Sequence, residues 1–168
     1  MLKNPELKKE GKKLINQGYA LADTCQRTRH ENENSALALV SKNISFTVMV
    51  KSAEKKNIFR KLGKKHSKKK AAAIIHSVKL YFALQGRIKD VPGVYICSEG
   101  FHKSVLKQHL KQIMGKEFDE KKIFIVPSLT AMFGKKNIAD RLAWKVIKRK
   151  QKPNLLLKEE HFKILKLL

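Results

Sequence analysis

The spacing of apolar residues changes once along the chain, and this change restricts the possible folds more than any other feature. Between residues 19 and 52 the apolar residues come in short runs. In residues 45–52, for example, Phe46, Val48 and Val50 alternate with Thr47 and Met49. Such alternation is typical of half-buried strands. From residue 68 onward, longer segments with helical spacing are separated by short apolar runs. The pattern therefore predicts an α/β fold.

The first part of the pattern predicts three strands, at residues 19–24, 35–41 and 45–52. The first two are separated by a wholly polar segment, residues 26–34, which we expect to be a loop. Lys42-Asn43 makes a tight turn between the second and the third. Short connections join antiparallel strands, so we expect an antiparallel meander.

The second part predicts helices that alternate with two further strands. We expect a basic connection at 53–66, which leaves room for a helical turn around Ile58-Phe59, and then a long helix at 68–85 and a strand at 94–97. A helix at 101–114, a strand at 122–126 and a helix within 135–150 that has a loop-like opening at 134–136 follow. Strand–helix–strand crossovers make neighbouring strands parallel. The expected fold is α/β, with a mixed five-stranded sheet (a three-strand antiparallel meander plus two parallel strands) flanked by helices.

Two terminal segments flank this domain, which covers residues 18–150. Residues 1–17 predict a basic helix, in which Asn4-Pro5 provides a cap and a proline at the first helical position. Residues 151–168 break at Lys152-Pro153-Asn154 and then predict an amphipathic helix from Leu155 to Leu168. The apolar face of that last helix is a candidate surface for a protein partner.

The charge of the chain indicates a polyanionic partner. Lys and Arg number 38 against 14 Asp and Glu, so the formal net charge is +24, while 42% of the residues are hydrophobic. The hydrophobic fraction favours a folded core over a basic tail. A compact body with this excess charge repels itself unless counterions or a polyanion are present. We expect nucleic acid, because neutralised phosphates release condensed counterions; an anionic membrane or ribosome surface is the alternative.

Two basic segments are the candidate phosphate contacts. Residues 55–70 contain nine Lys or Arg and no acid, and residues 145–152 are also basic. A solvated loop is the alternative interpretation of the first segment. Aromatic residues make up only 7% of the chain, so we expect recognition of shape and backbone more than of bases. The candidate nucleic-acid-binding residues are Lys55, Lys56, Arg60, Lys61, Lys64, Lys65, Lys68, Lys69, Lys70, Lys145, Lys148, Arg149 and Lys150.

The remaining composition bears on location. Cys25 and Cys97 are the only cysteines, too few for a disulfide framework or a closed zinc site. They favour a reducing compartment, and we expect an intracellular, cytoplasmic protein. No apolar run approaches the roughly 20 residues of a membrane span, and the N-terminal residues lack the apolar centre of a secretion signal.

Two short motifs give the chain a resemblance to a known family. ALADTC, residues 20–25, and NIADRLA, residues 137–143, resemble the first-strand aspartate motif and the last-helix opening of the ribonuclease H-like superfamily of nucleases, resolvases and transposases. The resemblance covers roughly residues 18–150. It implies that Asp23 and Asp140 lie at a metal centre, and it makes Glu99 the candidate for the acid that follows the fourth strand.

The resemblance implies chemistry at these three acids. They would be both catalytic residues and metal ligands, with Mg²⁺ or Mn²⁺ as the cofactor if the protein is catalytic. Magnesium binds carboxylates, water and phosphate oxygens, and two ions about 3.5–4 Å apart can drive phosphodiester hydrolysis. Asp140 also has a simpler explanation, because a carboxylate in the first turn stabilises a helix.

The sequence departs from the family at one position, and two functions therefore stay open. Family enzymes carry a glutamate early in the first long helix, where this chain has Lys68-Lys69-Lys70-Ala71. Glu31, Glu33 and Glu54 are alternative acids. One function is a metal-dependent nuclease that cleaves phosphodiester bonds. The other is a non-catalytic RNA- or DNA-binding component of a ribonucleoprotein or another nucleic-acid assembly.

Overall fold

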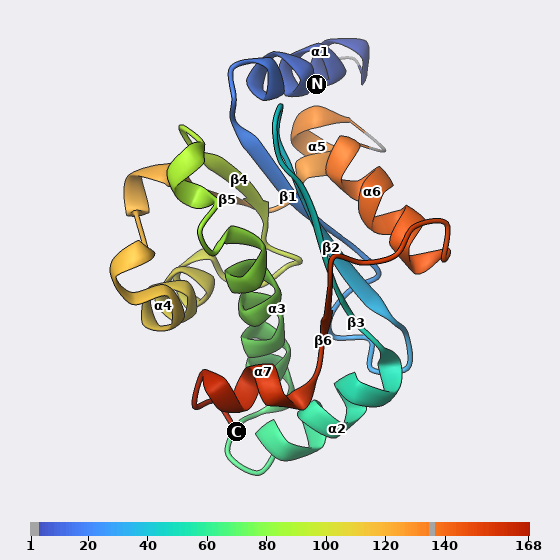
Figure 1. The fold of residues 1–168 in the computed structure, drawn as a ribbon, viewed down its shortest axis with the longest axis vertical. Helices are drawn as coiled ribbons and strands as arrows, with labels where there is room; N and C mark the ends of the chain where they lie inside the picture. The colour runs from blue at the N-terminus through green and yellow to red at the C-terminus, as the bar shows by residue number, and fades with distance from the viewer. Residues whose placement is uncertain (1–3, 135–136) are drawn as a thin grey trace.

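A mixed β-sheet runs through the molecule and carries helices on both faces (Figure 1). The computed structural model describes residues 4–134 and 137–168. The loop-like opening predicted at residues 134–136 falls largely on residues 135–136, outside the described part of the chain.

The sheet contains six strands in the order β5-β4-β1-β2-β3-β6. Only β2 runs against the others, because it pairs antiparallel with β1 and β3, whereas β4 pairs parallel with β1, β5 with β4 and β6 with β3. The strands are β1 (Ala20–Cys25), β2 (Ser35–Val40), β3 (Ser45–Val50), β4 (Val94–Cys97), β5 (Ile123–Val126) and β6 (Leu155–Leu157). The predicted meander and the two parallel strands are confirmed, but the predicted count of five strands is wrong.

Side chains of β1 alternate between the two faces of the sheet. Ala20 and Ala22 belong to the core on one face, while Leu21 belongs to the core on the other. Successive side chains of a strand point to opposite faces, so Asp23 follows Leu21 to its face. This alternation decides which helix the Asp23 carboxylate meets.

The larger core lies on the face that carries Ala20 and Ala22. Its apolar residues come from α3 (Lys68–Leu84), α4 (Lys103–Met114), α2 (Ser52–Leu62) and α7 (Glu159–Ile164). In the described part of the chain, three 3₁₀ turns connect elements, at Ile88–Asp90, Gly115–Glu117 and Glu120–Lys122. α3 is buried along most of its length, as expected for a helix packed between the sheet and other helices.

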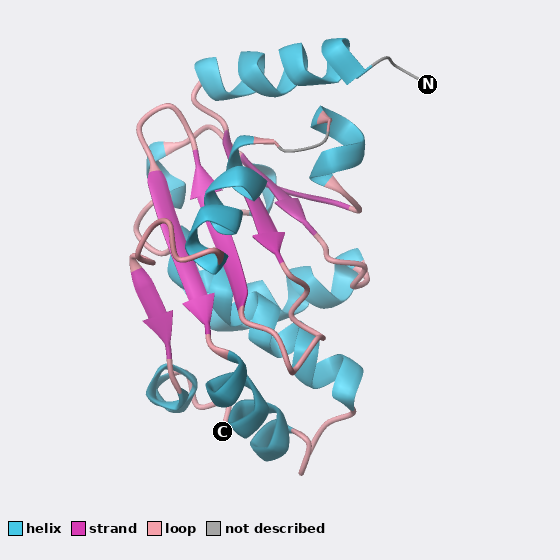
Figure 2. Ribbon diagram, turned by 90° about the vertical axis from the view of Figure 1, so that its right-hand side faces the viewer, coloured by secondary structure: helices cyan, strands magenta, loops and turns pink. Residues whose placement is uncertain are grey.

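The opposite face is covered by α6 (Ile138–Ile147), with α5 (Leu129–Phe133) beside it and α1 (Asn4–Asn16) against α5 (Figure 2). Ala139 and Ala143 of α6 are fully buried against β1 and β2. Their small side chains let the helix approach the sheet closely. This approach places the start of α6 next to Asp23.

The predicted basic connection at 53–66 is a helix for most of its length. α2 buries Lys55, Ile58, Phe59 and Leu62, at the i, i+3, i+4, i+7 spacing of a helix face. Because the first of these positions is a lysine, only three apolar residues marked the face in the sequence.

The predicted C-terminal helix at 155–168 is also wrong. Leu155–Leu157 form β6 beside β3, and only Glu159–Ile164 are helical. Asn154 fixes the start of the strand: its Oδ1 accepts hydrogen bonds from Thr47 N at 2.8 Å and Thr47 Oγ1 at 2.9 Å, while Asn154 N donates to Thr47 Oγ1 at 3.0 Å. The fully buried Phe162 then attaches α7 to the larger core.

Candidate functional site

Asn137 connects the first strand to the last helix. It is the N-cap of α6, where its Oδ1 accepts a hydrogen bond from Asp140 N at 3.0 Å. Its Nδ2 donates to Asp23 Oδ2 at 2.7 Å, and Thr24 N donates to the other Asp23 oxygen at 2.8 Å. One side chain therefore caps the helix that carries Asp140 and holds the buried carboxylate of Asp23.

Asp23 and Asp140 form a pair of acids between β1 and α6. Burial raises the pKa of Asp23 above its ordinary value; the hydrogen bonds from Asn137 and Thr24 lower that pKa, and the negative charge of Asp140 raises it. Two carboxylates that repel each other in a buried setting favour a proton or a cation between them. The structure thus brings together two of the three predicted acids.

Cys25 and Cys97 lie beside this aspartate pair. Burial raises the pKa of the Cys97 thiol to about 12, and the charge of Asp23 adds to the effect. Burial also raises the pKa of Cys25, with Asp140 as the next cause. Both thiols are therefore protonated at neutral pH, which makes them poor nucleophiles.

Glu99 lies on the other side of the sheet, beneath α3. Its side chain is 4% exposed, with Oε1 3.7 Å from Lys79 Nζ and Oε2 3.7 Å from His76 Nδ1. Thr28 N donates to Oε2 at 3.1 Å. Burial alone would raise the pKa of Glu99, but Lys79, His76 and Thr28 hold it at about 2. Glu99 is thus a buried anion whose neighbours are cationic or polar.

The cluster around Glu99 contains two fully buried lysines. Lys79 Nζ donates to Ser35 Oγ at 2.7 Å, and Ser35 Oγ donates to the carbonyl oxygen of Gln26 at 2.8 Å. Lys55 Nζ has no hydrogen-bond partner among the described residues. Burial, followed by the charge of Lys79, lowers the pKa of Lys55 to about 8. The prediction that Lys55 binds phosphate is wrong, because its ammonium group is inside the protein.

His76 belongs to the same cluster as a neutral imidazole. Burial lowers its pKa to about 4, although the negative charge of Glu99 opposes this shift. His76 Nε2 donates to the Cys97 carbonyl oxygen at 3.1 Å, which leaves Nδ1 facing Glu99 without a proton. The His76 side chain is fully buried, so neither ring nitrogen can contact a substrate.

The donor set does not fit a two-ion centre. Within the described residues, no three His, Cys, Asp or Glu side chains gather closely enough to hold a metal ion. The three alternative acids have other partners within the protein. Glu31 forms an ion pair with Lys68 at 2.7 Å, Glu33 pairs with His30 at 3.3 Å, and Glu54 accepts a hydrogen bond from Glu159 N at 2.6 Å. The assignment of Asp23, Glu99 and Asp140 as one ligand set stays a prediction.

The outer face of α6 is basic and carries the single tryptophan of the chain. Arg141, Trp144, Lys145 and Lys148 are exposed at helical spacing, and Trp144 is 41% exposed. Lys150 Nζ lies 4.8 Å from the centre of the indole ring. We call Arg141, Trp144, Lys145 and Lys148 the α6 stripe. Sequence reasoning named the two lysines but missed Arg141 and Trp144, although both are exposed on the face away from the buried Ala139 and Ala143.

Two grooves border the α6 stripe, and both contain Arg141. One runs past α1 and includes Lys12, and the other runs along the β2–β3 turn and includes Lys42 and Lys145. Among the described residues, no Asp or Glu belongs to the lining of either groove. The surface next to the aspartate pair is therefore cationic on both sides of the helix.

The other predicted basic residues divide into exposed and paired groups. Lys61 forms an ion pair with Glu159, and Lys68 forms one with Glu31. Arg60 donates to Asn57 Oδ1 at 2.9 Å. The rest are exposed around α2 and the start of α3, or at the end of α6: Lys56, Lys64, Lys65, Lys69, Lys70, Arg149 and Lys150.

Comparison of the chain with protein-family models, curated proteins and solved structures finds no match. No helix in the described ranges combines the length and the apolar character that a membrane crossing requires. Function must therefore be argued from the geometry of the site and from its charge.

Proposed function

We propose that the chain binds nucleic acid through its phosphate groups, using the α6 stripe and the grooves beside it. The observation that carries the proposal is the combination of cations and an exposed indole on one helix face. Lysine and arginine neutralise phosphates, and an aromatic face stacks on bases without regard to sequence. A net charge of +24 supplies long-range attraction.

We further propose that the domain is a ribonuclease H-like one. Support comes from the two motifs that suggested the resemblance. They are more than a hundred residues apart, yet Asn137 of the second donates directly to Asp23 of the first. The motif aspartates occupy the central strand and the helix that covers it. Chance similarity in two short stretches gives no reason for them to meet.

A metal-dependent nuclease is the second candidate, and the raised pKa of Asp23 is the observation that favours it. One magnesium ion can bind through one or two carboxylates together with substrate phosphates, which suits Asp23 and Asp140. The chemistry that such an ion supplies is polarisation of a phosphodiester. Because the third predicted acid lies elsewhere, the binding function is the better supported of the two.

Trp144 provides a direct test, because it is the only tryptophan. Its fluorescence should be quenched when single-stranded RNA or DNA is titrated into the protein, as expected for a base stacked on the indole. Replacing Arg141, Lys145 and Lys148 together with Gln should weaken binding by on the order of tenfold or more, since each phosphate contact contributes to affinity.

The matched control removes the same charge elsewhere. Lys89, Lys116 and Lys121 are exposed in three 3₁₀ turns and line neither groove beside α6, and their triple replacement with Gln also removes three positive charges. This control should lose only the general electrostatic attraction and keep the quenching. Equal loss of affinity in both triple variants, or unchanged Trp144 fluorescence at saturation, would exclude α6 as the binding face.

A further inference from the structure

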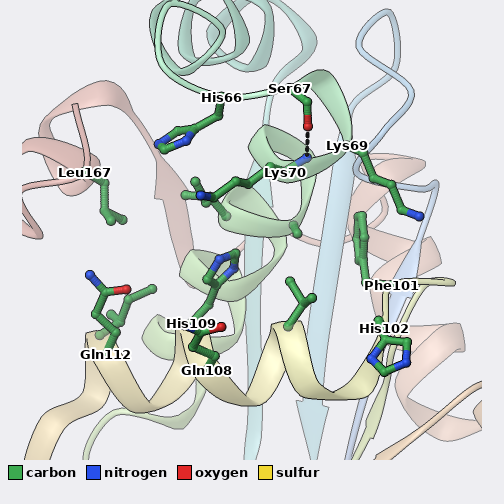
Figure 3. A pocket seen from close by; sticks show the side chains of 14 residues that line it. His66, Ser67, Lys69, Lys70, Phe101, His102, Gln108, His109, Gln112 and Leu167 are labelled. Carbon is green, nitrogen blue, oxygen red and sulfur yellow. Dashed lines mark hydrogen bonds between the residues drawn. The ribbon is translucent and has the colours of Figure 1, made fainter.

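A cavity of about 510 Å³ lies between the first half of α3, the outer turns of α4 and the loop before α3 (Figure 3). It is on the α3 side of the sheet, whereas the aspartate pair is on the α6 side. Its volume falls within the range of small-ligand sites. The site is thus spatially separate from the α6 stripe.

One side of the cavity carries a lysine and two histidines. Lys70 extends from the first turn of α3, His66 from the preceding loop and His109 from α4, and all three point into the same space (Figure 3). Burial lowers the pKa of His109, and the positive charges of Lys70 and His66 lower it further. No carboxylate is among the described residues that line the cavity. An anion would therefore meet the Lys70 ammonium group and two imidazoles without a competing acid.

The same side contains a buried imidazole nitrogen and several groups able to donate hydrogen bonds. His109 Nδ1 is buried and has no hydrogen-bond partner among the described residues, while the imidazole is hydrogen-bonded to the backbone of Ala73. Gln108 and Gln112 extend their amides from the neighbouring turn of α4. α3 begins here, with Ser67 as its N-cap, and the N-terminus of a 17-residue helix has free N–H groups and a positive partial charge. The N–H groups at the start of α3 and the glutamine amides are suited to phosphate oxygens.

The other wall is apolar. Val105 is 36% exposed although it is aliphatic, and Phe101, which also lines the cavity, is buried. An inorganic anion would leave this surface without a partner, whereas a base or sugar would cover it. The apolar lining consists of Ala73, Ile74, Phe101, Val105, Ile113 and Leu167.

We propose that this cavity binds a nucleotide, with a phosphate ester at Lys70, His109 and the start of α3 and with the nucleoside against the apolar wall. A free mononucleotide and the phosphorylated end of a strand present the same chemistry. The proposal does not depend on nucleic-acid binding at α6, because a mononucleotide can be tested alone.

The test uses the full chain labelled with ¹⁵N. Adenosine 5′-monophosphate, adenosine and inorganic phosphate are titrated separately, followed by a short single-stranded oligonucleotide with either a 5′-phosphate or a 5′-hydroxyl. Backbone amide shifts report the site, and the shifts at residues 66–74 and 101–113 are those expected to change. Lys70→Gln and His109→Gln are compared with Lys64→Gln, which changes an exposed lysine of the same segment that does not line the cavity.

The nucleotide, or the 5′-phosphorylated strand, should perturb these amides and bind more tightly than phosphate or the 5′-hydroxyl strand. For the mononucleotide, Lys70→Gln should weaken binding about tenfold, the loss expected for one charge-assisted hydrogen bond, while Lys64→Gln should not, because Lys64 does not line the cavity. Tight binding by the mononucleotide identifies a free nucleotide as the ligand; binding by the 5′-phosphorylated strand alone identifies a strand end. The proposal would be overturned if no probe changes the shifts of the cavity amides, or if the mononucleotide binds no more tightly than phosphate. Equal loss of mononucleotide affinity in Lys64→Gln and Lys70→Gln would also overturn it.

Discussion

The buried ammonium group of Lys55 lowers the stability of the fold. Its Nζ is buried beside Lys79 and has no hydrogen-bond partner in the described part of the chain. Glu99 is the one buried carboxylate among the charges that act on Lys55, and it also faces Lys79; Glu31 and Glu33 act on Lys55 from the partly exposed β1–β2 loop, where they pair with Lys68 and His30. A buried ammonium without a partner destabilises a protein. This position is therefore one where an apolar side chain should improve stability.

Lys55→Met should stabilise the protein near neutral pH by on the order of 1–3 kcal/mol. The folded pKa of Lys55, about 8, lies below the ordinary value of 10.5. Between these values the unfolded chain binds more protons, so the stability of the wild type rises as pH increases from about 8 to 10.5. The advantage of the variant should therefore shrink across that window. Urea unfolding of the variant and the wild type at both ends of this pH window measures the difference in stability.

Lys56→Met is the matched control, because Lys56 is the exposed neighbour on α2. It should change the free energy of unfolding by no more than a few tenths of a kcal/mol at either pH. A Lys55→Met protein that is less stable than the wild type near neutral pH would show that the buried ammonium of Lys55 does not destabilise the fold.

Asp140→Asn tests whether the aspartate pair binds a metal ion. If it does, manganese should raise the melting temperature of the wild type, because an ion that binds only the folded state stabilises it by mass action. The shift should disappear in both Asp140→Asn and Asp23→Asn. Without metal, Asp140→Asn should not lower stability by more than about 1 kcal/mol, since it removes a charge that repels Asp23.

Glu99→Gln distinguishes the aspartate pair from the predicted three-acid set. It should lower the melting temperature, because it leaves Lys79 as an uncompensated buried charge, yet keep the manganese shift on that lower baseline. Loss of the shift in Glu99→Gln alone would favour Glu99 as a ligand. No shift in the wild type would exclude the nuclease candidate.

Sequence reasoning located Asp23 and Asp140 but misplaced Lys55 for a physical reason. Motif position and strand alternation are local properties, and they suffice to bring the two aspartates to one side of β1. The burial of Lys55 depends on a helix face completed by distant contacts with α3 and the β1–β2 loop. A lysine in a lysine-rich run carries no local sign that it is the buried member.

At the scale of elements, the loop between α2 and α3 and the start of α3 form an exposed basic segment. Replacing Lys64, Lys65, Lys68 and Lys69 with Gln should weaken binding to all nucleic-acid sequences about equally, because phosphate contacts carry no sequence information. The melting temperature should stay nearly unchanged, since these side chains are exposed. Thermal melting and fluorescence anisotropy measure the two effects. Collapse of folding would show that the segment is structural.

The elements that sequence reasoning recovered share a strong local signal. β2, β3 and β4 are short apolar or alternating runs, and α3 is a long periodic segment. β6 was not predicted, because LLL, residues 155–157, fits a helix face as well as a strand. What decides in favour of the strand is the free edge of β3 and the pairing of Asn154 with Thr47, and neither is visible in the local pattern.

At the scale of the whole molecule, charge should govern binding. Surface cations occur on α6, around the start of α3 and at the grooves beside the β2–β3 turn. We predict that the logarithm of the binding constant falls linearly with the logarithm of salt concentration. The slope should be about −0.9 per phosphate contact on duplex DNA and about −0.7 on single strands. Affinity that stays constant from low to high salt would contradict phosphate-dominated binding.

The pairing of β6 with β3 also protects the molecule from aggregation. Without β6, the backbone of β3 at Val48–Val50 would be an open ladder, and such ladders recruit strands from other molecules and cause aggregation. The link that precedes β6 contains the exposed basic residues Lys148, Arg149, Lys150 and Lys152, and trypsin-like proteases cut after lysine and arginine. A single cut there would leave most of the core intact while it frees the segment that protects the sheet edge. Proteolytic damage at this link would thus convert a well-folded protein into a seed for self-association.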